Sequence, residues 1–233
     1  METVACPSPN FDQRPKDAPV DILLFHYTGM ETAAAAVARL CDPDARVSAH
    51  YTVDEDGTVY SHVAEECRAW HAGVSYWAGA TDINARSIGI EVVNPGHEFG
   101  YRSFPDAQVE ALIELGRDVV ARHRVPPERV LGHSDVAPAR KMDPGELFPW
   151  ATLAKAGIGL WPDSRGPRRN EGGSIEAQLR RFGYGFRPDT DVSLDASLTA
   201  FQRHFRPARI DGIPDQECER ILATLLATLD PDA

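Results

Sequence analysis

Ile88-Gly89-Ile90-Glu91-Val92-Val93 is an apolar run in which β-branched residues surround a single carboxylate. β-Branched side chains favour strands, and a strand that is apolar on both faces is typical of the middle of a sheet. The run therefore predicts a central strand. Burial of a carboxylate is costly unless the group is paired or has a chemical task, so Glu91 is a candidate functional residue.

The segments on either side of this run predict further strands and helices. An apolar strand is expected over residues 21–28, and it carries His26 near its end. Residues 47–63 predict two strands joined by a tight turn at Asp56-Gly57, because this dipeptide favours positive φ angles. A short strand at 130–132 leads into His133. Helices are expected at about 31–40, over 105–123 from its three- and four-residue apolar spacing, and from near Pro149. The mixture predicts an α/β fold.

A composition change marks a boundary near residue 162. Residues 161–173 are dense in Gly, Pro and charge, which is typical of a linker. We therefore predict one domain over 1–162, a linker over 163–173 and a second, small domain over 174–233.

The second domain is predicted to be a three-helix unit. Helical patterns occur at 175–181, 194–204 and 215–229, separated by Gly and Pro. Its expected core consists of the large apolar residues on these segments, namely Leu179, Phe201, Phe205, Ile221 and Leu225.

Composition excludes several function classes. The net charge of −11 argues against nucleic acid or an anionic membrane as partner, and no apolar run approaches the roughly 20 residues that span a bilayer. The cysteines lack C-x-x-C spacing and are expected to be free thiols. The first residues lack the basic and apolar regions of a secretory signal, so we expect a cytoplasmic protein, or a periplasmic one if a leader was removed. The cysteines are Cys6, Cys41, Cys67 and Cys218.

Residues 132–145 combine an imidazole, an ammonium and a carboxylate in one turn-rich stretch. Lys141 and Asp143 point to the same side if the backbone is extended, so a salt bridge on a loop is one interpretation. The other is a hydrolase site, in which His133 and Asp143 bind Zn²⁺ and Lys141 stabilises an oxyanion beside the metal.

His26, His133 and Asp143 each follow or end a predicted strand or loop. Two imidazoles and one carboxylate leave the fourth position of a tetrahedral zinc open, which is the arrangement of catalytic zinc sites. The spacing alone leaves open whether the three converge.

Six motifs occur in an order that resembles a known family. They are Phe25-His26-Tyr27-Thr28, Val47-Ser48-Ala49-His50-Tyr51, Trp70-His71-Ala72-Gly73, Ser87-Ile88-Gly89-Ile90-Glu91, Gly132-His133-Ser134-Asp135 and Lys141-Met142-Asp143-Pro144-Gly145. Together they resemble the type-2 N-acetylmuramoyl-L-alanine amidases over roughly residues 20–160. The branch with an appended C-terminal peptidoglycan-binding-like domain is the most similar.

The resemblance implies a mixed central β-sheet flanked by helices and a zinc enzyme. Such an enzyme hydrolyses the amide between N-acetylmuramic acid, or its 1,6-anhydro form, and L-alanine of the stem peptide, so peptidoglycan fragments are the expected partners. By position, His26, His133 and Asp143 match the zinc ligands. Glu91 matches the general base, and Lys141 matches the residue that stabilises the tetrahedral intermediate.

Four further residues are candidates for substrate contact. Trp70 and His71 lie in the Trp-His-Ala-Gly motif, although an aromatic beside a histidine is also ordinary core or rim material. Arg86 and Asn94 flank the strand of Glu91, and Arg86 is a candidate partner for a stem-peptide carboxylate or a solvated loop charge. His50 is expected to be a packed structural histidine.

Two alternatives concern the role of the whole protein. The resemblance also includes recognition proteins that bind peptidoglycan without cleaving it. Within the enzyme class, recycling of soluble fragments in the cytoplasm competes with cleavage of the intact wall. The C-terminal segment replaces the usual Asp-Gly-x-x-Gly turn of wall-binding domains with residues 188–193, so it either binds peptidoglycan or only packs against the first domain.

Overall fold

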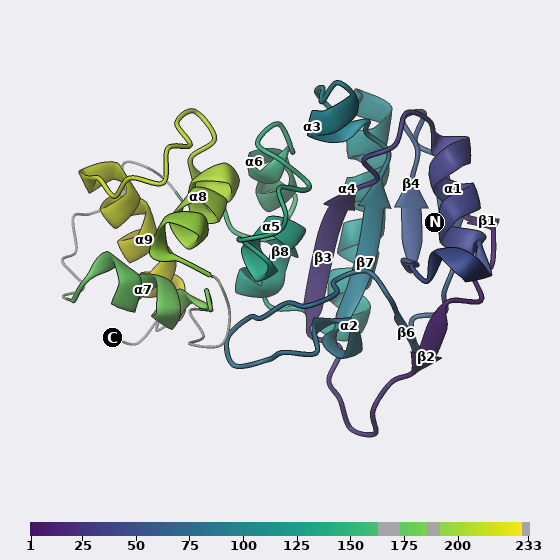
Figure 1. The fold of residues 1–233 in the computed structure, drawn as a ribbon, viewed down its shortest axis with the longest axis horizontal. Coiled ribbons are helices and arrows are strands. Elements are labelled where there is room, and N and C mark those ends of the chain that lie inside the picture. The colour runs from purple at the N-terminus through teal and green to yellow at the C-terminus, as the bar shows by residue number, and fades with distance from the viewer. Residues whose placement is uncertain (163–172, 186–191, 230–233) are drawn as a thin grey trace.

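The computed structural model describes residues 1–162, 173–185 and 192–229 (Figure 1). Its strands are β1 (Val4–Ala5), β2 (Phe11–Gln13), β3 (Ile22–Tyr27), β4 (Tyr51–Val53), β5 (Val59–Ser61), β6 (Cys67–Ala69), β7 (Ser87–Val92) and β8 (Val130–Gly132).

A mixed six-stranded sheet forms the centre of the molecule, in the order β1-β5-β4-β7-β3-β8. Strand β7 lies between β4 and β3 and is parallel to both, which confirms the predicted central strand. Strands β4 and β5 form the predicted antiparallel hairpin. A second, two-stranded sheet of β2 and β6 was not predicted, because the exposed residues of β2 show no apolar alternation.

The helices are α1 (Ala33–Cys41), α2 (Ile83–Arg86), α3 (Gly96–Phe99), α4 (Asp106–His123), α5 (His133–Val136), α6 (Trp150–Lys155), α7 (Ile175–Phe182), α8 (Leu194–Phe205) and α9 (Gln216–Leu229), with 3₁₀ turns at Pro43–Ala45 and Pro127–Arg129. Helix α1 begins two residues later than expected, since Thr32 Oγ1 accepts the Ala35 N–H at 3.2 Å and caps the helix there. Within the described ranges, no helix has the length and apolar character needed to cross a bilayer.

Alternate residues of β3 serve two hydrophobic clusters, one on each face of the sheet. Leu23 and Phe25 pack in a cluster with residues of α4, including Leu112 and Val119. On the opposite face, Ile22 and Leu24 belong to a cluster that continues into the C-terminal helices. This alternation follows from the two-residue period of a strand.

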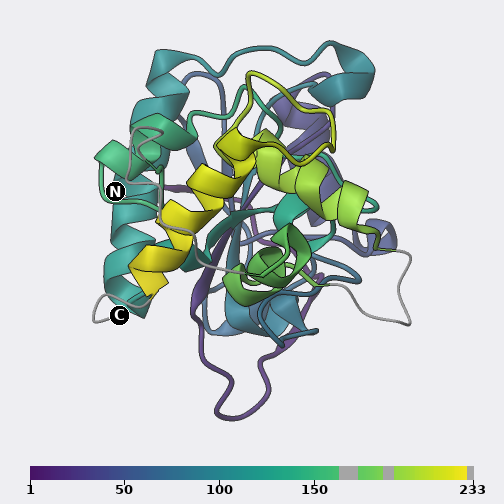
Figure 2. The same cartoon turned by 90° about the vertical axis from the view of Figure 1, so that its left-hand side faces the viewer.

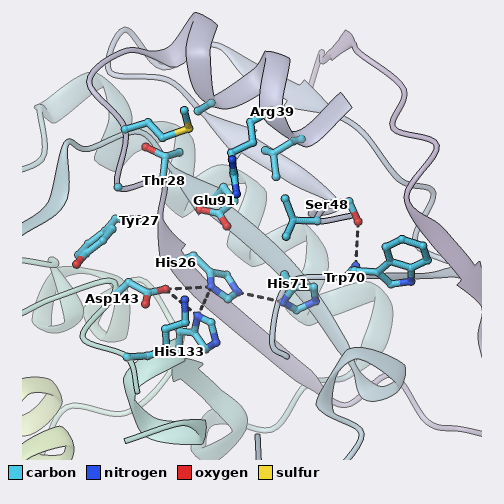
Figure 3. Close-up of a pocket in the computed structure, with 16 residues that line it drawn as sticks. His26, Tyr27, Thr28, Arg39, Ser48, Trp70, His71, Glu91, His133 and Asp143 are labelled. Carbon is cyan, nitrogen blue, oxygen red and sulfur yellow. Dashed lines mark hydrogen bonds and ion pairs between the residues drawn. The ribbon is translucent and has the colours of Figure 1, made fainter. Parts of the chain in front are cut away.

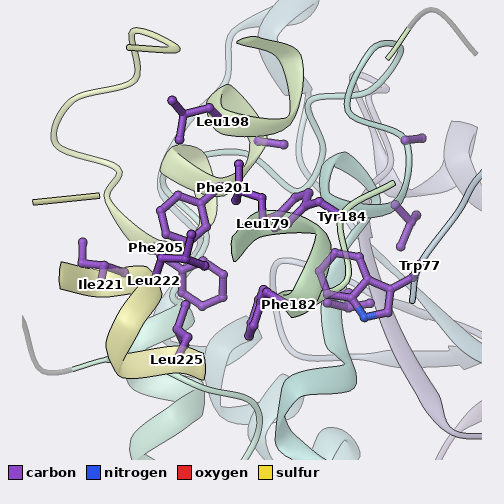
Figure 4. Close-up of a cluster of buried hydrophobic side chains, with 14 of the residues drawn as sticks. Trp77, Leu179, Phe182, Tyr184, Leu198, Phe201, Phe205, Ile221, Leu222 and Leu225 are labelled. Carbon is purple, nitrogen blue, oxygen red and sulfur yellow. The ribbon is translucent and has the colours of Figure 1, made fainter. Parts of the chain in front are cut away.

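The C-terminal helices lie at one end of the molecule, beside α5 and β8 (Figures 1 and 2). Their side chains share a single buried cluster with sheet residues and with Trp77 (Figure 4). The five predicted core residues are all buried in it: Leu179, Phe201, Phe205, Ile221 and Leu225. The predicted linker, apart from Gly173, and most of the 188–193 turn lie outside the described residues.

Candidate metal centre and catalytic site

Three neighbouring strands bring the candidate residues together at their carboxyl ends. In the parallel register of β3 and β7, His26 pairs with Glu91, and paired residues of adjacent strands point to the same face. Strand β8 lies on the other side of β3, and His133 follows it directly as the first residue of α5. The sheet topology therefore brings together side chains from distant parts of the sequence.

His26, His133 and Asp143 converge through one atom each. Their Nδ1, Nδ1 and Oδ2 atoms are separated by 3.0 Å between the histidines, 3.1 Å from His26 to Asp143 and 3.0 Å from His133 to Asp143 (Figure 3). All three side chains are buried, and the group has the composition of a metal site. Zinc bonds of about 2.0–2.1 Å in a tetrahedron place ligand atoms roughly 3.3 Å apart. The observed spacing fits such an ion.

The remaining nitrogens of both histidines are held inside the protein. His26 Nε2 lies 3.0 Å from His71 Nδ1, and His133 Nε2 donates to the Ala72 carbonyl at 3.0 Å. Because the carbonyl can only accept, His133 Nε2 carries a proton, and Nδ1 is the atom that faces Asp143. Such contacts orient metal-binding histidines.

The electrostatics of the site favour a neutral His26 and an ionised Asp143. Burial, reinforced by His133, lowers the pKa of His26 to about 4. Burial likewise lowers the pKa of His71 well below its usual value. Burial opposes ionisation of Asp143, but His133 and His26 outweigh it and hold the pKa of that carboxyl below its ordinary range. These are the protonation states that metal ligands require.

Glu91 is a carboxylate with a raised proton affinity. Burial raises its pKa well above the ordinary value, Asp143 adds to the effect and Lys141 opposes it. Its Oε2 atom is inaccessible and has no hydrogen-bond partner among the residues that the structure describes. A buried polar atom of this kind is unusual in a structural role and common at catalytic sites.

A cavity of about 300 Å³ opens over these residues. It is lined by the three ligand candidates, by Glu91 and by two cations, Lys141 and Arg39. Figure 3 shows the Arg39 side chain reaching from α1 toward Glu91. A cavity with two cations and a half-buried carboxylate suits a polar substrate that carries carboxylates.

The four predicted substrate contacts divide into two pairs. Trp70 and His71 line the cavity, with the Trp70 indole N–H donating to Asp12 at 2.7 Å.

Arg86 and Asn94 are not among the lining residues. Arg86 forms an ion pair with Asp21 at the opposite end of β7, and the Asn94 amide supports the turn after β7 through Arg102 and Gly96. The prediction for this pair relied on proximity to Glu91 in the sequence, which does not give the direction of a side chain. We therefore do not place them among the substrate contacts.

His50 occupies a packed position, as expected. It is buried, and its Nδ1 accepts the Gly89 N–H at 2.9 Å. Arg39 was not predicted as a site residue, because the sequence of helix α1 shows only an Ala-rich packing pattern. The supporting role of Asn84 was not predicted either: its Oδ1 accepts the N–H groups of His71 at 3.1 Å and Ala72 at 2.8 Å. No local pattern marks that side chain as a support for the loop.

The fold and the site define an amidase. Residues 16–146 match the family described as N-acetylmuramoyl-L-alanine amidase, and the chain belongs to that family. It is thus a hydrolase of the amide that joins the N-acetylmuramoyl group to L-alanine, and the predicted fold class and enzyme class are confirmed.

Three relatives illustrate the extent of the similarity. AmiD of Escherichia coli K12, an N-acetylmuramoyl-L-alanine amidase, is 38% identical over 236 residues, which cover 91% of this chain and 84% of AmiD. Its solved complex with the substrate anhydro-N-acetylmuramic acid-L-Ala-D-gamma-Glu-L-Lys has a TM-score of 0.79 at 36% identity and covers 94% of each chain. AMPDH3 of Pseudomonas aeruginosa, solved in complex with anhydromuramic pentapeptide, has a TM-score of 0.80 at 33% identity and covers 98% of this chain and 99% of that chain. The 1,6-anhydro-N-acetylmuramyl-L-alanine amidase AmpD of Salmonella typhimurium SL1344 is 33% identical over 167 residues, 64% of this chain and 87% of AmpD.

Proposed function

We propose that this protein is a zinc-dependent amidase that releases the stem peptide from anhydro-muropeptides during recycling of the cell wall. The observation that carries the proposal is the convergence of His26, His133 and Asp143 within 3.1 Å of one another. They lie beside Glu91, whose Oε2 has no hydrogen-bond partner among the described residues. Two nitrogens and one carboxylate oxygen are a donor set that suits Zn²⁺.

His26, His133 and Asp143 would hold the ion through Nδ1, Nδ1 and Oδ2. When bound there, zinc supplies a Lewis acid for the scissile carbonyl and lowers the pKa of a water molecule in its fourth position. The lowered pKa values of His26 and Asp143 support this assignment, because zinc binds a neutral imidazole and an ionised carboxylate.

Glu91 is proposed as the general base and acid. Its raised pKa makes the carboxylate a better proton acceptor than an exposed glutamate, because proton affinity rises with burial. It would take the proton of the attacking water and pass it to the leaving amine of L-alanine. The cavity gives the water and the leaving amine access to the Glu91 side chain.

Lys141 is proposed to stabilise the negative charge that develops on the carbonyl oxygen. Its side chain lines the same cavity as Glu91 and Asp143, and no ion pair joins it to another described residue. A cation without a carboxylate partner is available for an oxyanion. Trp70, at the edge of the cavity, is proposed as a contact for the sugar or the stem peptide.

The proposal that the substrate carries the 1,6-anhydro sugar rests on the relatives. AmiD and AMPDH3 were solved with anhydro-muropeptides, and the similarity to both extends through the C-terminal helices. We propose that residues 1–162 form the catalytic part, that 174–233 support it through the shared core, and that 163–173 connect the two.

The cytoplasm is the proposed location, supported by four free thiols, which suit a reducing compartment. A tagged protein recovered from the periplasm would contradict it.

Mass spectrometry of two purified substrates tests the proposed reaction. The protein is incubated with an anhydro-muropeptide and with the matched muropeptide that carries a reducing sugar. We expect free sugar and an intact peptide beginning with L-alanine, formed faster from the anhydro substrate. Cleavage at another bond would refute the amidase assignment, and binding without cleavage would indicate a recognition protein instead.

A further inference from the structure

His71 lies between His26 and Ser87 and has a contact at each ring nitrogen. His71 Nδ1 is 3.0 Å from His26 Nε2, and His71 Nε2 is 3.2 Å from Ser87 Oγ. Both nitrogens are therefore engaged within the protein. A ring in this position has no nitrogen left to bind a substrate.

The direction of each hydrogen bond follows from the hydroxyl of Ser87. Ser87 Oγ donates its single proton to the Ile83 carbonyl at 2.7 Å, so toward His71 it can only accept. His71 Nε2 must then carry the proton of the neutral ring, and Nδ1 is an acceptor. His26 Nε2 is consequently the donor to His71, which leaves the lone pair of His26 Nδ1 directed at His133 and Asp143.

The surrounding backbone fixes the position of the His71 ring. A Cβ atom on Gly89 would lie 2.5 Å from His71 Nδ1, so the ring packs directly on the backbone of β7 and only glycine fits beneath it. Asn84 holds the backbone N–H of His71 from the other side at 3.1 Å. Ser87 itself is fully buried in β7. These contacts leave the ring little freedom to turn.

We propose that Ser87 and His71 act as a positioning relay, which fixes the ring orientation and the tautomer of His26 for metal binding. The relay rests on the proposed zinc site, because it matters only if His26 Nδ1 binds an ion. It gives His71 a different task from the substrate contact that its motif suggested. Groups that orient a metal-binding histidine typically change metal affinity by about 10- to 100-fold when they are removed.

The test is the zinc affinity of the full chain, measured by competition with a chelating indicator. His71→Ala should raise the Kd for Zn²⁺ by about 10- to 100-fold. Ser87→Ala removes one neutral hydrogen bond and should raise it by about fivefold. His71→Asn, whose Oδ1 can accept where Nδ1 does, should recover part of the loss. Ser197→Ala is the matched control, because Ser197 is equally buried in α8 and its hydroxyl has no partner among the described residues.

The Co²⁺-substituted protein gives a second readout, because the visible absorption bands of Co²⁺ report its ligands. The relay predicts altered bands for Ser87→Ala and wild-type bands for Ser197→Ala. Wild-type protein that binds no zinc would refute the metal site itself. If wild type, His71→Ala and Ser87→Ala all bind zinc with the same affinity, the relay is refuted and the metal site is not. If His71→Ala has a raised KM and an unchanged zinc affinity, His71 is a substrate contact. If His71→Ala fails to fold, the zinc affinity and the Co²⁺ bands of Ser87→Ala decide whether the relay exists.

Discussion

Asp135 accepts a hydrogen bond of 2.7 Å from His204 Nδ1, which joins the helix of the metal-ligand candidate His133 to α8 of the C-terminal unit. Tyr184 donates to the other carboxylate oxygen, also at 2.7 Å, and all of these groups are buried. The C-terminal helices thus hold the segment that supplies His133. The same helices share one hydrophobic core with residues of the sheet.

Tyr184→Phe tests this junction. The variant leaves a buried carboxylate oxygen without its hydroxyl donor, and an unsatisfied buried acceptor costs about 1–3 kcal/mol. We expect the free energy of unfolding in urea to fall by that amount. Tyr76→Phe is the control, because Tyr76 packs near Gly185 at the same junction and its hydroxyl bonds to no described residue. Equal stabilities of the two variants would mean that the bond from Tyr184 to Asp135 does not stabilise the junction.

Glu91→Gln should remove turnover and keep the metal. The amide is nearly isosteric but cannot take a proton, and loss of a general base typically reduces the rate about 10²- to 10⁴-fold. The measurement is kcat on an anhydro-muropeptide together with zinc affinity, with the exposed Glu98→Gln as control. Retention of wild-type kcat would exclude Glu91 as the base.

Lys141→Ala should lower turnover more than metal binding. Its cation borders the cavity beside Asp143, and removal of one oxyanion donor typically costs about 10²- to 10³-fold in kcat. Parallel measurements of kcat and of zinc Kd separate the two effects, and Lys155→Ala, exposed at the end of α6, controls for net charge. A loss of zinc binding as large as the loss of kcat would assign Lys141 to the metal site.

Glu65 should make stability depend on pH at the acidic end. Burial opposes its ionisation, but hydrogen bonds from Arg122, His123 and Tyr51 outweigh it and lower the pKa of Glu65 to about 2. Since the folded pKa lies below the ordinary 4.5, the ionised group stabilises the fold above pH 4.5, and that contribution is lost as the pH falls toward 2.

The measurement compares the stability of wild type with that of Glu65→Gln, which lacks the titrating carboxyl group. Its stability deficit relative to wild type should shrink between pH 4.5 and pH 2 in urea unfolding at successive pH values. Glu110→Gln, exposed on α4, controls for the loss of one negative charge. A constant deficit for Glu65→Gln would mean that Glu65 has an ordinary pKa in the folded protein.

The sequence was sufficient to predict the site residues whose position follows from a strand. Glu91 and His26 lie in apolar strands, so burial and the chemical cost of a polar group there identified both, and the parallel register then paired them. The predicted substrate contacts Arg86 and Asn94 do not line the cavity, because short local structures, α2 and the turn after β7, direct their side chains to Asp21 and to backbone groups. The bond from His204 to Asp135 joins residues 69 positions apart, and no local pattern specifies it.

Activity during stepwise return of zinc to the chelated protein tests the central claim most directly. One anhydro-muropeptide is the substrate, and bound zinc is measured in the same samples. The account predicts no cleavage without metal and full cleavage at one equivalent of zinc in wild type, with neither binding nor cleavage in Asp143→Ala. Undiminished cleavage by the metal-free protein, or one bound equivalent of zinc without any cleavage, would contradict it.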